Sequence, residues 1–110
     1  MEIFVKGDVV VVPFPFSDLS GFKRRPALVA ATIPGDDTIL CLITSKGRED
    51  AYSVKLEEKD FAEGKLALNS VIRPNRLFGA EKSIISYKIG IIKETKAREV
   101  EEKLVKMIRS

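Results

Sequence analysis

The stretch GDVVVVPFPF (residues 7–16) gives the clearest indication of the fold. Its four consecutive valines are β-branched, which favours a strand and suggests burial on both faces of a sheet. Pro13 and Pro15 have no main-chain N–H to donate, so we expect the strand over residues 9–14 to end at a sheet edge or a bulge. The pattern around these residues is therefore that of a β protein.

Short apolar runs separated by turn signals continue this pattern along the chain. We expect further strands over residues 25–32, 38–45, 52–56, 70–73 and 87–92, an acidic turn or helical bend over 57–64, and a helical turn over 83–86. The segments between them are mostly too short for crossover helices, so the sheet should be mostly antiparallel. The predicted fold is mainly β, a small barrel of five to six mostly antiparallel strands, with a C-terminal α-helix.

The predicted helix follows Thr95, which suits an N-cap position. Its apolar side chains stand at helical spacing, at Ala97, Val100, Leu104, Met107 and Ile108. Charged residues fill the opposite face. Such an amphipathic helix can dock on its own sheet, on a partner or on a membrane, and we expect it to pack on the sheet.

The totals fit one soluble domain over residues 1–110. The net charge of +3 is a mild excess that permits an anionic partner without requiring one. No basic segment followed by an apolar core marks a signal peptide, and no apolar run approaches the roughly 20 residues of a membrane span. A single cysteine, Cys41, lies in an apolar run, so we expect a buried, inert thiol and a cytoplasmic location.

The sequence contains no histidine, which removes the commonest general base and the commonest metal ligand. With only one cysteine besides, the composition argues against a zinc site. The paired carboxylates Asp36-Asp37 and Glu57-Glu58 look like turn and surface positions rather than a magnesium site. We therefore expect no metal and no cofactor, with any catalysis carried by Arg, Lys, hydroxyl or carboxyl side chains.

Cations gather at the start of the second predicted strand, in FKRRPALV (residues 22–29). Lys23, Arg24 and Arg25 run directly into Pro26 and a buried strand. An arginine on a rigid element suits phosphate binding, because its guanidinium donates two parallel hydrogen bonds. The alternative is a solvated basic turn. Further cations and hydroxyls lie at Thr44, Ser45 and Lys46, and at Arg73 and Arg76.

Four segments in the same order resemble the MazF/PemK family, the toxins of bacterial and archaeal toxin–antitoxin pairs. They are GDVVVVPFPFSD (7–18), RRPALV (24–29), LITS (42–45) and NSVIR (69–73). The resemblance spans about residues 5–95. It implies an SH3-like barrel with a C-terminal helix, a homodimer, and metal-independent endoribonuclease activity on single-stranded RNA.

The resemblance also assigns roles to residues. The family's catalytic arginine precedes the proline of the second strand, which is Arg25 here, and its partner threonine ends the third strand, which is Thr44. Guanidinium groups have a reference pKa of about 12.5–13.8, so we expect Arg25 to act mainly by electrostatics. The expected RNA contacts are Phe16, Ser17, Asp18, Lys23, Arg24, Ser45, Lys46, Arg73 and Arg76. The loop before Arg25 lacks the Glu- or Gln-rich stretch common in the family, which bears on base preference.

The resemblance further implies a cognate antitoxin with a disordered, partly acidic segment that folds into the RNA groove. Two other functions are compatible with the sequence. One is a non-catalytic small barrel that binds nucleic acid or a peptide. The other is a gyrase poison like CcdB. The resemblance to CcdB implies that such a protein acts through a tryptophan near its C-terminus, and this chain has no Trp.

Overall fold

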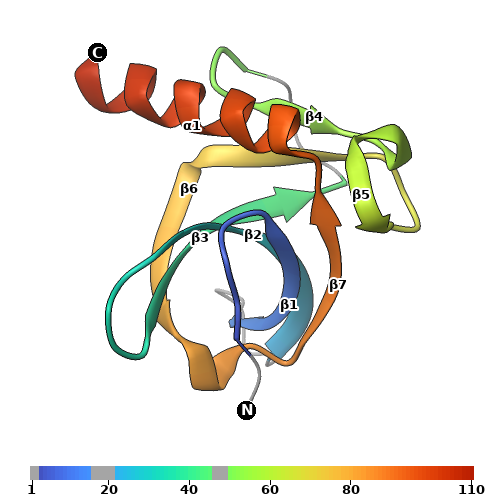
Figure 1. Cartoon of the computed structure of the whole chain (residues 1–110), viewed down its shortest axis with the longest axis vertical. Helices are drawn as coiled ribbons and strands as arrows, with labels where there is room; N and C mark the ends of the chain where they lie inside the picture. The colour runs from blue at the N-terminus through green and yellow to red at the C-terminus, as the bar shows by residue number, and fades with distance from the viewer. Residues whose placement is uncertain (1–2, 16–21, 46–49) are drawn as a thin grey trace.

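The structure is a computed structural model that describes residues 3–15, 22–45 and 50–110, with the main chain alone at Pro15 and Phe22. In this part of the chain, a seven-stranded curled sheet carries one α-helix and two short 3-10 helices (Figure 1). The elements are β1 (Asp8–Pro15), β2 (Phe22–Thr32), β3 (Asp37–Thr44), β4 (Val54–Leu56), η1 (Glu58–Asp60), β5 (Phe61–Gly64), β6 (Ser70–Glu81), η2 (Lys82–Ile84), β7 (Tyr87–Ile92) and α1 (Glu94–Arg109).

The strands follow the order β4-β6-β3-β2-β1-β7-β5, and the described neighbours all pair antiparallel. The predicted class, a mainly antiparallel β fold with a C-terminal helix, is confirmed. The sheet forms a half-barrel, and the predicted number of five to six strands was too low. The additional strand is β5, in a segment that we expected to be a bend. Only its first residue, Phe61, is buried, so it has no alternating pattern to detect.

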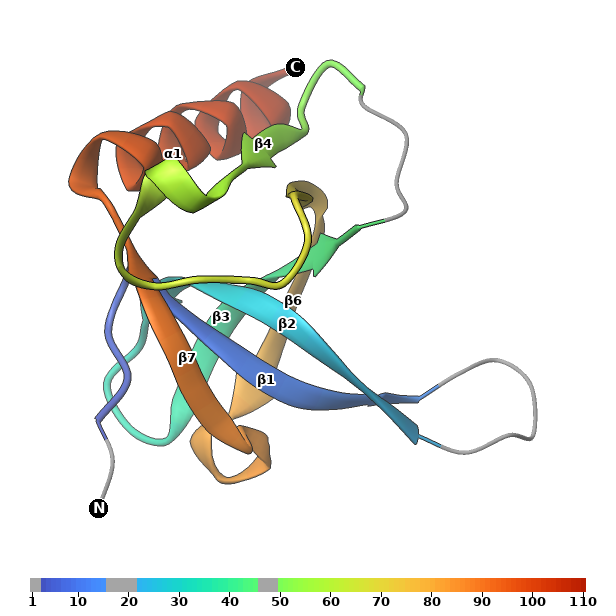
Figure 2. The ribbon, with the colours of Figure 1, turned by 90° about the vertical axis from the view of Figure 1, so that its right-hand side faces the viewer.

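The valine run of β1 is buried on both faces, as predicted. Val9 packs in one core cluster with Leu28, while Val10 and Val12 pack in a second cluster with Ala27. β7 pairs with β1 as far as Val11, and beyond that point the described partner of β1 is β2 alone. The prolines of β1 therefore lie where one side of the strand needs no donor, and the β1–β2 hairpin projects from the sheet (Figure 2).

The two core clusters lie on opposite faces of the sheet. The first includes Val100 of α1 and Ile43 of β3, so it fills the space between the sheet and the helix. The second includes Phe4 and Ile85, which cover the other face. Successive side chains of a strand point to opposite faces, so β1, β2, β3 and β6 each contribute to both clusters, whereas β4, β5 and β7 contribute to the first.

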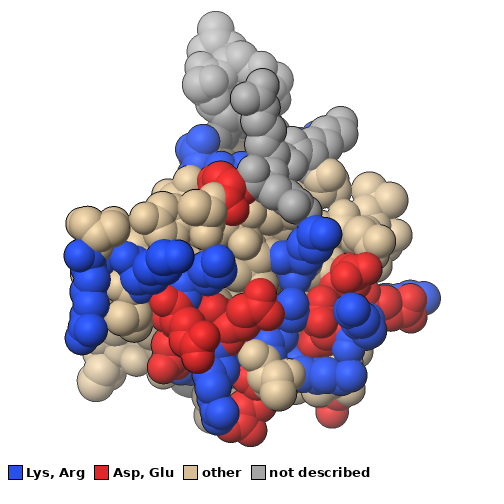
Figure 3. Space-filling view, turned by 90° about the horizontal axis from the view of Figure 1, so that it is seen from above, with Lys and Arg blue, Asp and Glu red and all other residues tan. Residues whose placement is uncertain are grey.

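Helix α1 begins at Glu94 with Lys93 as its N-cap, so the predicted N-cap at Thr95 was wrong by two residues. The start is fixed by tertiary contacts, because the Lys93 N–H donates to the Asp60 carbonyl at 2.8 Å and Lys96 Nζ lies 3.6 Å from Asp60 Oδ1. Val100 anchors the helix to the sheet, which confirms the predicted docking. No helix in the described residues is long and apolar enough to cross a membrane. Seen from the side where α1 lies, cations and anions are interspersed (Figure 3).

Strand β6 is longer than predicted because it is interrupted rather than ended at Pro74. Its pairing with β3 jumps from Leu42↔Arg73 to Cys41↔Leu77, which leaves residues 74–76 as a bulge. Pro74 itself is buried and has no N–H to donate, so it suits such a break in the ladder. The bulge carries Asn75 and Arg76 to the surface.

Candidate functional site

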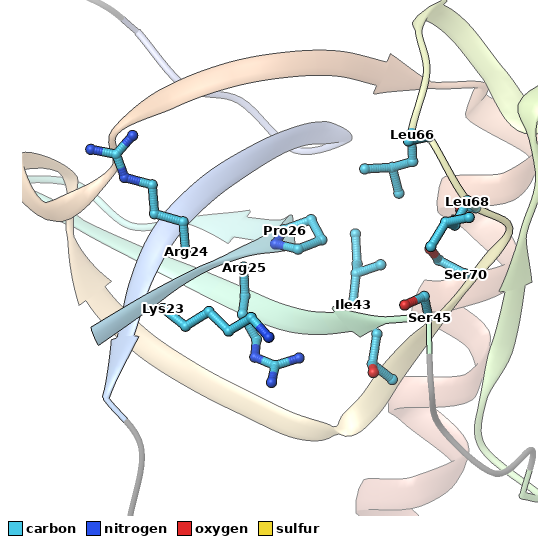
Figure 4. Close-up of a pocket in the computed structure, with 11 residues that line it drawn as sticks. Lys23, Arg24, Arg25, Pro26, Ile43, Ser45, Leu66, Leu68 and Ser70 are labelled. Atoms are coloured by element: carbon cyan, nitrogen blue, oxygen red, sulfur yellow. The ribbon is translucent and has the colours of Figure 1, made fainter. Parts of the chain in front are cut away.

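A cavity of about 310 Å³ lies where β2 begins and β3 ends, next to the segment that precedes β6 (Figure 4). Its lining residues are Lys23, Arg24, Arg25, Pro26, Ile43, Thr44, Ser45, Leu66, Ala67, Leu68 and Ser70. Five of the predicted site residues, Lys23, Arg24, Arg25, Thr44 and Ser45, are among them. The fold therefore brings together residues that are separated by about twenty positions in the chain.

Arg25 is paired with β1 on one side and lies just beyond the β2–β3 ladder on the other. On β1 its partner in the register is Val12, which is fully buried. On the other side, the ladder to β3 ends at Ala27↔Leu42, just after Pro26, which cannot donate to it. Arg25 lies on the same face of β2 as Ala27 and is the first residue on that face beyond the β2–β3 ladder. Its half-buried side chain adjoins the cavity.

Thr44 occupies the matching position on β3. It lies two residues beyond Leu42, as Arg25 lies two residues before Ala27, so in an antiparallel pair both are the next residues on the same face. Its place is fixed from the other side by pairing with Val71 of β6. A guanidinium and a hydroxyl, both half-buried, therefore adjoin each other at the end of the β2–β3 ladder.

The side chains at the start of β2 point to two different faces of the sheet. Figure 4 shows Lys23 and Arg25 pointing to one side of β2, whereas Arg24 points to the other side. Pro26 and Ile43 face Leu66 across the hollow, so this wall of the cavity is apolar. The cavity thus combines an apolar wall with a cationic rim, which suits a ligand that has both a phosphate and a flat base.

Arg73 lies near this site, but it is engaged in an ion pair. It is half-buried opposite Leu42, on the face of β6 that Thr44 shares through Val71. Its Nη2 lies 3.4 Å from Asp50 Oδ2, and its Nε donates to Asn75 Oδ1 at 3.4 Å. Asn75 Nδ2 in turn lies 3.5 Å from Asp50 Oδ2. We call these three residues the Asp50–Arg73–Asn75 cluster.

The remaining predicted contacts are distributed as follows. Ser45 is exposed at the end of β3, and Arg76 is exposed on the bulge of β6, outside the cavity lining. Phe16, Ser17, Asp18 and Lys46 lie outside the described residues.

The sequence reasoning missed the segment 66–70, which forms one wall of the cavity, and it missed Asp50 and Asn75. Asp50 and Ser53 have the spacing of a local turn, which was a detectable signal. Nothing in the sequence connects Asp50 to Arg73, 23 residues away.

Cys41 takes no part in the site. It is buried in the core cluster beneath α1, and burial raises the pKa of its thiol from 9.0 to about 12. The thiol is therefore protonated and unreactive at neutral pH, as predicted. In the described ranges, no three His, Cys, Asp or Glu side chains gather closely enough to hold a metal ion.

Comparison with known proteins identifies the family. The profile of the "PemK-like, MazF-like toxin of type II toxin-antitoxin system" matches residues 5–108. The chain belongs to this MazF/PemK family. The match extends past the region that carries the sequence resemblance and includes almost all of α1. No curated protein matches this MazF/PemK chain significantly by sequence.

Solved structures show that the MazF/PemK chain has the fold of its family. MazF of Deinococcus radiodurans (Form-I) superposes with a TM-score of 0.76 at 19% identity, covering 100% of both chains. A MazE–MazF structure (Form-III) from the same organism gives 0.76 at 20% identity and covers 98% of both. An endoribonuclease in complex with its cognate antitoxin, from a mycobacterial species, gives 0.76 at 14% identity, covering 97% of this chain and 96% of that one.

Proposed function

We propose that this MazF/PemK-family chain is the toxin of a type II toxin–antitoxin system and that it inhibits translation as a metal-independent endoribonuclease acting on single-stranded mRNA. The observation that carries the proposal is the adjacency of Arg25 and Thr44 at the end of the β2–β3 ladder, on a cavity. These are the two positions at which the family's catalytic residues fall. The apolar wall and cationic rim of the cavity supply a place for a base and its phosphate.

The cleavage reaction requires few groups from the protein. The ribose 2′-oxygen attacks the adjacent phosphorus and the bond from phosphorus to the 5′-oxygen breaks, which leaves a 2′,3′-cyclic phosphate and a 5′-hydroxyl. The 2′-hydroxyl loses its proton and the departing 5′-oxygen gains one. The protein has to align the chain for in-line attack and stabilise negative charge on the phosphorane oxygens.

Arg25 supplies that charge stabilisation. Its guanidinium forms two parallel hydrogen bonds to the non-bridging oxygens, and it is oriented because Val12 and Pro26 fix its main chain. Thr44 adds a hydroxyl donor to the same phosphate. The two protons pass through water or a neighbouring hydroxyl.

The exposed residues around the cavity would hold the rest of the RNA. Lys23, Arg24, Arg73 and Arg76 contact its backbone in this proposal, and Ser45 also contacts the RNA. The residues Phe16, Ser17, Asp18 and Lys46 remain part of the proposed contact set by family resemblance. Phe16 is the aromatic among them on which a base can stack.

The proposed partners follow the family. The similar chains from Deinococcus radiodurans and the mycobacterial species were crystallised with MazE and with a cognate antitoxin. We extend this to the present chain as binding of a partly disordered, acidic antitoxin segment to the RNA groove of a homodimer in the cytoplasm. An acidic segment suits a cationic rim that also takes phosphate.

The deciding experiment incubates the purified protein with a mixed-sequence single-stranded RNA in the presence of EDTA. We expect discrete cuts with 2′,3′-cyclic phosphate and 5′-hydroxyl ends. Arg25→Ala should lower the rate by about 10²–10³-fold, because one preorganised donor is lost. Arg25→Lys should remain well below the wild type, since lysine keeps the charge but loses the fork.

Two results would contradict the proposal. Binding of RNA without cleavage across a broad panel indicates a non-catalytic module. Cleavage that stops in EDTA, or that Arg25→Ala leaves unchanged, indicates another mechanism. Exposed Arg98 on α1, paired with Glu94, offers the charge-matched control Arg98→Ala, which should cleave like the wild type.

A further inference from the structure

The Asp50–Arg73–Asn75 cluster has no net charge but carries many hydrogen-bond donors and acceptors. Arg73 and Asp50 carry opposite charges and lie within 3.4 Å of each other, so together they are neutral. A phosphate is attracted chiefly by uncompensated cations, and such a pair offers it little net charge. The cluster still presents guanidinium and amide donors beside carboxylate and amide acceptors.

The cluster is held firmly in place. Asp50 Oδ1 accepts hydrogen bonds from the main-chain N–H groups of Tyr52 and Ser53 at 2.9 and 2.8 Å. The Asp50 N–H donates to Ser53 Oγ at 2.9 Å, which closes the turn. Its second oxygen is thereby directed at Arg73. On the other side, buried Pro74 fixes the bulge that presents Asn75.

The cluster also lies close to the proposed cleavage point. Arg73 pairs with Leu42, whereas Thr44 pairs with Val71, so Arg73 and Thr44 are diagonal neighbours on one face of the sheet. Diagonal neighbours of a sheet are typically about 7–8 Å apart, which is within reach of a long side chain such as that of arginine. A base next to the cleaved phosphate is therefore within reach of the cluster.

We propose that the Asp50–Arg73–Asn75 cluster is a base-reading site that determines which RNA sequence is cut. In it, Arg73 and Asn75 hydrogen-bond the edge of an unstacked base, and Asp50 positions Arg73 and cancels its charge. Unstacked bases of single-stranded RNA are read through hydrogen bonds of this kind. The inference rests on the proposed endoribonuclease function and revises the part of Arg73 from backbone contact to base contact.

The test maps cut sites on a long mixed-sequence RNA for the wild type, Asp50→Asn, Arg73→Ala, Asn75→Asp and the control Arg98→Ala. We expect Arg73→Ala to relax the preference at one nucleotide next to the cut by about 5- to 150-fold, the range for one well-formed base contact. Asp50→Asn keeps an oxygen for the turn but loses the compensating charge, so it should relax the same nucleotide. Asn75→Asp replaces an amide donor by an acceptor and should change the preferred base there.

A binding measurement separates base reading from phosphate binding. The probe is an RNA of the mapped sequence with a 2′-deoxy nucleotide at the cut, which cannot react. If Arg73 contacted a phosphate, Arg73→Ala would reduce the magnitude of the negative slope of log K against log salt by about 0.7. Base reading predicts an unchanged slope.

Three results overturn the inference. The first is an unaltered cut-site distribution in Asp50→Asn and Asn75→Asp, measured on variants whose circular dichroism matches that of the wild type. Because Asn75 is exposed, Asn75→Asp should fold even if Arg73→Ala does not, so the test remains possible. The second is a uniform loss of cleavage at all sites with a reduced salt slope. The third is a wild type that cuts no RNA. This result refutes the proposed function as well, whereas the first two refute only the inference about the cluster.

Discussion

Thr44 is the residue whose contribution can be separated most cleanly from folding. Thr44→Val keeps the β-branched shape at a half-buried strand end but removes the hydroxyl. A hydrogen bond to a charged group contributes about 1.5–3 kcal/mol, so we expect the single-turnover cleavage rate to fall by about 10- to 100-fold. Thr44→Ser keeps the hydroxyl and should retain most of the rate. Equal rates for the valine variant and the wild type would remove Thr44 from the mechanism.

Cys41 gives a pH dependence at the residue scale. Burial raises the pKa of its thiol from 9.0 to about 12, so the unfolded chain loses this proton at lower pH than the folded chain. The resulting stability is complete below pH 9 and is lost as the pH rises toward 12. We expect the urea midpoint of Cys41→Ala to depend less on pH than that of the wild type in this window. A native thiol that reacts with a disulfide reagent at pH 8 as fast as a free cysteine would contradict the burial.

At the scale of elements, β5 and β7 approach each other so closely at Gly64 and Gly90 that neither position has room for a side chain. Gly64 pairs with Gly90, has a φ of +75°, and a Cβ placed on it would lie 2.7 Å from the Gly90 Cα. Gly35, in the turn after β2, has a φ of +106° but no described atom within 4 Å of such a Cβ. The two glycines thus share a left-handed backbone and differ in the space around them.

This difference predicts two sizes of destabilisation. Gly35→Ala should lower the free energy of unfolding by about 1–2 kcal/mol, the cost of a left-handed alanine. Gly64→Ala adds a clash with main-chain atoms and should lower it by about 3 kcal/mol or more. Urea unfolding of both variants checks the expectation. Similar losses for the two would mean that β5 can move away from β7 at little cost.

The whole molecule carries a net charge of only +3, with cations and anions mixed on the side where α1 lies, so RNA affinity depends on local cations (Figure 3). Each phosphate contact to a single strand contributes about −0.7 to the slope of log K against log salt. With three to five contacts around Lys23, Arg24 and Arg25, we expect a slope of about −2 to −3.5 for a non-cleavable RNA.

Variants at the rim test this localisation of charge. Lys23→Ala should reduce the magnitude of that slope by about 0.7, whereas Arg98→Ala on α1 removes the same charge and should leave it unchanged. Fluorescence anisotropy between 50 and 300 mM salt is a suitable measurement. Equal effects of the two variants would show that RNA responds to net charge rather than to this site.

Local sequence was sufficient for the β class and for most strand positions. The four valines of β1 and the apolar run of β3 are strong signals because both faces of these strands are buried. Sequence also singled out Arg25, since a proline and a buried strand directly follow it. Short-range patterns carry such information because side-chain periodicity and main-chain donors are local properties.

Only the tertiary structure decided the rest. The start of α1 depends on Asp60 of a distant turn, β5 exists through pairing with β7, and β6 continues past Pro74 because a bulge absorbs it. The adjacency of Arg25 and Thr44 follows from the register of two strands. The ion pair between Arg73 and Asp50 spans 23 residues. Such contacts depend on register and on the closing of loops, and these are set by the packing of the whole sheet rather than by any one segment.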